Sequence, residues 1–96
     1  MNILVTYDVS TITSAGRRRL RRAARVCCDF GQRVQQSVFE CSVDEKQMVL
    51  LRSRLLDEVD LEEDNLRLYR LSGAFADVVE QYGKDRRVDF EGPLIV

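Results

Sequence analysis

Asp8 is the first residue whose type and position could support chemistry. It stands where the apolar run of residues 3–5, typical of a buried strand, gives way to polar residues. A carboxylate is an oxygen ligand of the kind that Mg²⁺ binds, and water and substrate phosphates usually complete the coordination shell. Carboxylates at strand ends also commonly serve as turn residues or helix caps. The sequence position by itself leaves both roles open for Asp8.

The chain contains no histidine, which restricts the chemistry that it could perform. Ser-His-Asp and Cys-His catalytic groups are excluded, so hydrolysis would depend on carboxylates, tyrosines, basic side chains or metal-bound water. One aspartate provides too few ligands for a metal site. A two-fold dimer axis near the strand end would bring in Asp8 of a second copy as a second ligand. Cys27, Cys28 and Cys41 form no CxxC pair, and we expect reduced core thiols rather than zinc ligands.

Arginines form the second candidate site, with six of them in residues 17–25. Guanidinium groups clamp phosphates bidentately, so this surface fits a nucleic-acid backbone without implying base recognition. The alternatives are a solvated face that acids of residues 58–63 neutralise, or a surface for an acidic protein partner. On a helix, four arginines share one face and two flank the first turn: Arg18, Arg21, Arg22 and Arg25, and then Arg17 and Arg19.

Charge is distributed unevenly along the chain. Residues 1–36 carry a net charge of +5 and residues 37–96 carry −6, although the total is only −1. This asymmetry lets a nearly neutral protein attract an anionic partner locally. The acidic run of residues 57–64 is typical of a solvated turn. No apolar run reaches the ~20 residues of a membrane span, and no signal peptide is evident, so we expect a cytoplasmic protein without a membrane partner.

The elements that must position these side chains follow from apolar periodicity and turn signals. Residues 74–83 fit either a short helix ending at Gly83 or an irregular strand, and residues 93–96 fit an edge strand. The main elements are expected as strands over about residues 2–8, 34–43 and 66–71, and as helices over about residues 15–29 and 45–58.

Capping residues mark the ends of both helices. We expect Thr13 or Ser14 to cap the first helix and Gly31 to stop it. Asp44 and Gln47 fit a capping box at the start of the second. The expected apolar stripes are Leu20, Ala23, Ala24, Cys27 and Phe30 in the first helix, and Met48, Leu51, Leu55 and Leu56 in the second.

The order of elements predicts the fold class. A break within residues 34–43 gives the order βαββαβ, which is the ferredoxin-like split βαβ arrangement. We therefore predict a single α+β domain over residues 1–96, with an antiparallel sheet and both helices on one face. Its core would cover about residues 2–71, and the tail of about residues 72–96 would add an edge strand and pack on a dimer partner. The uncovered sheet face would be available to that partner.

Four stretches together resemble the Cas2 family of CRISPR-associated proteins. They are LVTYDVS, GRRRLRR, GQRVQQSVFE and LRLYRLSG, in matching order and spacing over about residues 2–71. The resemblance implies a ferredoxin-like homodimer whose C-terminal strand crosses to the other protomer. It also implies a divalent cation, usually Mg²⁺, between the paired Asp8 side chains, and endonuclease activity on single-stranded RNA or, in some members, double-stranded DNA.

The resemblance also implies site residues and partners. In spacer acquisition the family dimer bridges two dimers of the CRISPR integrase and supports DNA on its basic surface. We therefore expect either a magnesium-dependent endonuclease or a non-catalytic scaffold of that complex. By strand alternation Tyr7 points away from Asp8, so a core role remains open for it, as it does for Phe39. The family's functional positions fall on Tyr7, Asp8, Arg17, Arg19, Arg33 and Phe39.

Overall fold

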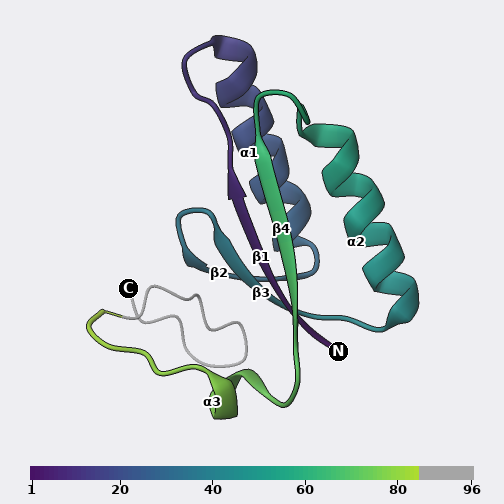
Figure 1. The fold of residues 1–96 in the computed structure, drawn as a ribbon, viewed down its shortest axis with the longest axis vertical. Coiled ribbons are helices and arrows are strands. Elements are labelled where there is room, and N and C mark those ends of the chain that lie inside the picture. Colours follow the sequence, from purple (N-terminus) through teal and green to yellow (C-terminus); the bar gives the residue numbers. More distant parts are fainter. Residues whose placement is uncertain (85–96) are drawn as a thin grey trace.

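The computed structural model describes residues 1–84, and the predicted edge strand over residues 93–96 lies outside them. Most of the predicted elements are present with small shifts in their bounds (Figure 1). The described part of the chain runs through β1 (Asn2–Asp8), α1 (Ser14–Cys28), β2 (Gly31–Gln35), β3 (Val38–Ser42), α2 (Glu45–Glu58), β4 (Asn65–Leu71) and α3 (Phe75–Val78).

The four described strands form one antiparallel sheet in the order β2-β3-β1-β4. The expected strand over residues 34–43 is divided into β2 and β3, with an irregular register between Arg33 and Gln35. Helices α1 and α2 lie on the same side of the sheet, and Figure 1 shows β4 passing in front of α1. These features confirm the predicted α+β, ferredoxin-like fold.

Apolar residues at regular spacing form the core between the sheet and the two helices. Tyr7 and every second residue before it in β1 are buried, as the pleat of a half-covered strand requires. The largest fully buried side chains come from the sheet and both helices, and the Val, Ile, Leu and Phe among them each contribute about 1.5–3 kcal/mol through their burial. They are Phe39, Ile3, Leu51, Leu55, Val5, Cys27 and Cys41.

Helix α2 has the predicted bounds but a slightly different apolar stripe. The reciprocal capping box is present, with the Gln47 amide donating to Asp44 over 2.7 Å and the Asp44 amide donating to Gln47 over 2.9 Å. The prediction that Leu56 belongs to the buried stripe is wrong, because its side chain is 45% exposed. Val59 is buried instead, since it follows Leu55 by four residues and so continues the same helical face.

The two ends of α1 depend on different local signals. Thr13 is the cap, and its hydroxyl accepts a hydrogen bond from the Gly16 amide over 3.0 Å. The expected stop at Gly31 is wrong, because α1 ends at Cys28 and Gly31 begins β2. A Cβ atom at Gly31 would collide with the carbonyl oxygen of Glu40 in β3. Glycine is therefore required there by the close approach of two strands.

The described tail lies partly against its own sheet. Its only helical turn, α3, ends at Val78, so residues 74–83 form neither a helix ending at Gly83 nor a strand. Residues 79–81 line a cavity of about 200 Å³ together with Leu4, Val34 and Val38 of the sheet. Within residues 1–84, no helix is long and apolar enough to cross a membrane.

Candidate functional site

Asp8 lies at the exposed end of β1, opposite Asn65 of β4 in the strand register. Its carboxylate makes no hydrogen bond or ion pair with any residue in the range 1–84. Strand alternation places it on the sheet face that the helices leave uncovered, together with Thr6 and Leu4. No side chain or backbone group within residues 1–84 therefore competes with a cation for this exposed carboxylate.

One chain supplies only part of a metal site. Among the described residues, no group of three or more histidine, cysteine, aspartate or glutamate side chains could hold a metal ion. The cysteines offer no ligand set: burial raises the pKa of the Cys27 thiol to about 12 and that of the Cys41 thiol to about 11. Asp8 alone fits a hard divalent cation only where a second carboxylate, water or phosphate completes the shell.

Tyr7, Phe39 and Arg33 form a cluster on the helix-covered side of the sheet. The Tyr7 and Phe39 rings are stacked with their centroids 6.1 Å apart, and the Arg33 guanidinium carbon lies 5.2 Å from the Phe39 ring centroid. Tyr7 is 5% exposed and Phe39 is 0% exposed, so both occupy core positions. The cluster and Asp8 therefore face opposite sides of β1, although the resemblance assigns all four residues to function.

The Tyr7 hydroxyl is unsuited to act as a base. Burial, with a smaller contribution from the Cys27 thiol, raises the pKa of Tyr7 to about 12, and nearby Arg33 only partly offsets this rise. The hydroxyl is buried and has no hydrogen-bond partner among the described residues. Tyr7 also lines a pocket of about 230 Å³ between α1 and the sheet, with Arg21 and Arg33. At neutral pH this phenol stays protonated.

The arginines of α1 are exposed except Arg19, whose side chain is only 21% exposed. Arg17 donates to the carbonyl oxygen of Thr11 over 3.0 Å, and Arg22 lies 3.8 Å from a carboxylate oxygen of Glu58. The predicted shared face is exposed, and three of its members make no ion pair within residues 1–84. These are Arg18, Arg21 and Arg25.

Arg19 points to Asp64 instead of solvent. Its Nε donates to Asp64 Oδ2 over 2.8 Å and its Nη2 donates to Oδ1 over 3.3 Å. The Asp64 side chain is 0% exposed, so the prediction that residues 57–64 are a solvated turn is wrong at this position. Burial by itself would raise the pKa of Asp64. Hydrogen bonds from Arg19 and from the Asp60 and Ser10 amides have the larger opposite effect, so the pKa lies below its ordinary value. The only sequence signal was its place directly before a strand.

Comparisons with known proteins give matches in both sequence and structure. The sequence model of the family described as CRISPR associated protein Cas2 matches residues 1–82. The chain is 55% identical to the CRISPR-associated endoribonuclease Cas2 of Chlorobaculum tepidum and 53% identical to the CRISPR-associated endoribonuclease Cas2 1 of Moorella thermoacetica, each over the whole of both chains. It is similar to the crystal structure of Streptococcus pyogenes Cas2 at pH 6.5, with a TM-score of 0.79 and 49% identity over 86% of this chain and 100% of that one.

Proposed function

The chain belongs to the CRISPR-associated protein Cas2 family, and from this we propose that it is a metal-dependent endonuclease of CRISPR adaptation. The single observation that carries the proposal is the exposed Asp8 carboxylate, which has no partner within residues 1–84. The names of the two relatives favour RNA as the substrate, and double-stranded DNA is the second substrate to test.

In this proposal, some residues of the chain would bind the cation and others would bind the phosphate backbone. Asp8 would supply one carboxylate to a divalent cation such as Mg²⁺, and a symmetric dimer would supply two. When bound, the cation would make water more acidic and stabilise negative charge on the phosphate. The exposed arginines of α1 hold the nucleic-acid backbone. Tyr7, with its raised pKa, takes no proton from the attacking water at neutral pH.

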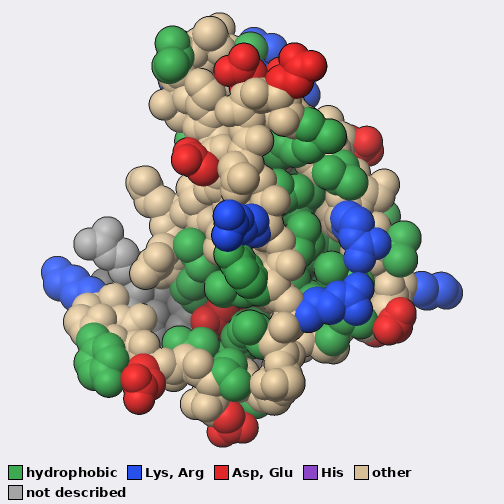
Figure 2. Space-filling model, viewed as in Figure 1, with side chains coloured by type: hydrophobic (Ala, Val, Ile, Leu, Met, Phe, Trp, Pro, Cys, Tyr) green, Lys and Arg blue, Asp and Glu red, His purple; other side chains and the backbone are tan. Residues whose placement is uncertain are grey.

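A homodimer is part of the proposal because residues 79–81 cover only part of the sheet face opposite the helices. Leu4 lies opposite both Glu40 and Tyr69 in the strand register, and Tyr69 is 41% exposed. Figure 2, viewed with the sheet in front of α1, shows hydrophobic side chains gathered over the middle of this face. A second copy would cover this face and bring a second Asp8 to the site. Sedimentation velocity should then give twice the mass of one chain.

The test of the nuclease proposal compares wild type with Asp8→Asn on RNA and on duplex DNA, each with Mg²⁺ and with chelator. We expect Asp8→Asn to abolish Mg²⁺-dependent cleavage while the dimer remains intact. Asp57→Asn, which changes an exposed acid of α2, is the matched control and should cleave normally. Cleavage that persists in Asp8→Asn, or in the presence of chelator, would refute the role of Asp8.

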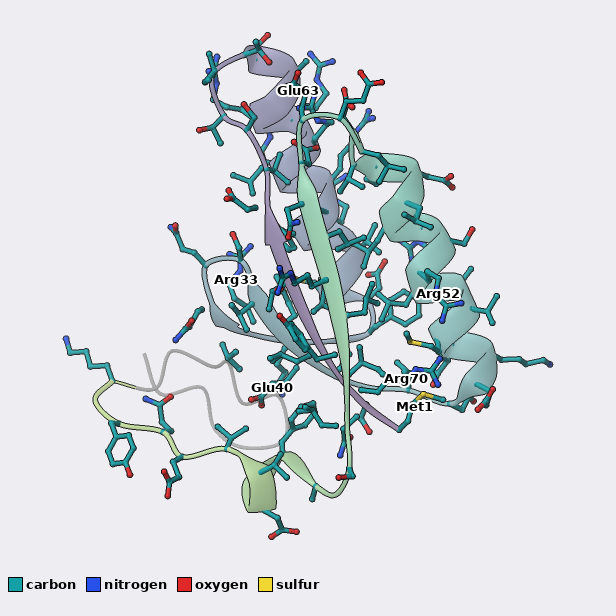
Figure 3. All side chains as sticks on the ribbon, in the orientation of Figure 1. Met1, Arg33, Glu40, Arg52, Glu63 and Arg70 are labelled. Carbon is teal, nitrogen blue, oxygen red and sulfur yellow. The ribbon has the colours of Figure 1, made fainter. Side chains whose placement is uncertain are left out.

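A scaffold that bridges integrase dimers on DNA is the second candidate function. It is favoured by the three exposed arginines that make no ion pair within residues 1–84. Replacing Arg18, Arg21 and Arg25 with glutamine should lower the slope of log affinity against log salt by about 2–3. Arg52→Gln removes one exposed charge from α2 and should leave the slope unchanged (Figure 3). An unaltered slope in the triple variant would refute the scaffold role of this face.

A further inference from the structure

One buried carboxylate joins three segments of the chain at the end of the sheet where Asp8 lies. Asp64 Oδ1 accepts a hydrogen bond from the Ser10 amide over 3.1 Å, and Oδ2 accepts one from the Asp60 amide over 2.8 Å. Both oxygens also accept hydrogen bonds from Arg19. Asp64 therefore connects the loop after β1, the turn before β4 and the first turns of α1.

These contacts fix the backbone next to Asp8 in its own chain segment and in the neighbouring strand. Ser10 follows Asp8 by two residues, and Asp64 directly precedes Asn65, the register partner of Asp8 in β4. Figure 1 shows the β1–α1 loop and the α2–β4 turn meeting at this end of the sheet. Figure 3 labels Glu63 in that turn, at the opposite end from Met1.

Arg19 is already committed to this junction. Its Nε and Nη2 both bond Asp64, whose carboxylate is completely buried. If Arg19 turned outwards to bind a phosphate, it would leave a buried negative charge without its cationic partner, which is strongly unfavourable. Sequence alone grouped Arg19 with the phosphate-binding arginines, and the geometry gives it a different role.

We propose that Asp64 is a positioning residue for Asp8, and that Arg19 acts through Asp64 and not on the substrate phosphate. The inference rests on the proposed function of Asp8 as a metal ligand. A carboxylate at a strand end binds a cation well only if the backbone beneath it is fixed. The Arg19–Asp64 pair fixes that backbone through the Ser10 amide, in the loop directly after β1, and through the start of β4.

The experiment measures backbone order and metal binding separately from cleavage. Asp64→Asn keeps the size of the side chain but removes the charge that accepts from Arg19. Nuclear magnetic resonance gives the hydrogen-exchange rate of the Ser10 amide, and a Mg²⁺ titration gives the shift of the Asp8 amide. We expect Asp64→Asn to speed exchange at Ser10 and to weaken Mg²⁺ binding, each by about tenfold, because hydrogen bonds to a charged acceptor are lost.

Two further variants make the result decisive. Arg54→Gln breaks the exposed pair between Arg54 and Asp29, 2.8 Å apart, and should change neither quantity. Arg19→Lys keeps a positive charge beside Asp64, so it should show the same two effects more weakly and with less risk to folding. Wild type without a Mg²⁺ response at Asp8 would refute the metal site and this inference together. A wild-type response that Asp64→Asn leaves unchanged would refute only the positioning role.

Discussion

Replacing Asp64 with asparagine should destabilise the fold measurably, although this residue lies in an acidic turn. The carboxylate accepts four hydrogen bonds, two from Arg19 and one each from the Ser10 and Asp60 amides. The single amide oxygen of asparagine can accept only about half of them, and its NH₂ group faces donors. The substitution therefore leaves buried donors unpaired.

The size of the effect follows from these contacts. Hydrogen bonds to a charged acceptor contribute about 1.5–3 kcal/mol, and some of this is kept by the remaining amide oxygen. We expect the free energy of unfolding to fall by about 2 kcal/mol in Asp64→Asn. For a domain of this size that corresponds to a fall of about 8–16 °C in Tm, measured by circular dichroism. Asp29→Asn, in the exposed pair with Arg54, should stay within about 1 kcal/mol of wild type.

The pH dependence provides an independent check. The pKa of Asp64 is lowered in the folded chain, so its stabilisation is present above the unfolded pKa of about 3.9 and is lost as pH falls through the folded pKa. The difference in Tm between wild type and Asp64→Asn should therefore be constant near neutral pH and shrink below about pH 4. A difference no larger than that of Asp29→Asn at pH 7, or one that persists in strong acid, would refute the reasoning.

Four further substitutions, one of them a control, test other parts of the structure. Tyr7→Phe removes a buried hydroxyl without a described partner, so stability should be unchanged or higher, and the pH profile of cleavage should not move. A loss of more than about 1 kcal/mol in denaturant unfolding would mean that the hydroxyl is bonded. Leu55→Ala should lower the free energy of unfolding by about 2–5 kcal/mol because Leu55 is fully buried. Leu56→Ala, one residue along the same helix, should lower it much less, and equal losses would contradict the observed buried face of α2. Gly31→Ala should lower the free energy of unfolding by about 1–3 kcal/mol because the added Cβ forces β2 away from β3. A Gly31→Ala variant as stable as wild type would exclude that close approach.

Local signals in the sequence predicted the parts of the fold that depend on neighbouring residues. The capping box of Asp44 and Gln47 gave the start of α2, and strand alternation placed Tyr7 inside and Asp8 outside. Gly31 was misread because a glycine after a helix usually ends it, whereas here its lack of a side chain serves a contact with the neighbouring strand. That contact is not visible in periodicity.

The Arg19–Asp64 pair is the contact that sequence could least predict. Its members are 45 residues apart, and each belongs to a run of like charges that is typical of a solvated surface. Arg19 and Asp64 come together because the loop after β1 and the turn before β4 lie side by side at one end of the sheet. Tertiary structure therefore pairs one member of each charged run with the other at the edge of the core, where the Asp64 side chain is shielded from solvent.

The arrangement of side chains also separates functional positions that sequence resemblance treats as one set. Tyr7 and Phe39 stack on the helix-covered side of the sheet, whereas Asp8 lies on the open side. One phosphate bound at Asp8 therefore meets neither ring directly within a single chain. The ring cluster supports the strand that carries Asp8, and Arg19 supports its end through Asp64. Under the proposed function, substrate binding would therefore depend on a cation at Asp8 and on the exposed arginines, and a second copy of Asp8 would complete the cation site.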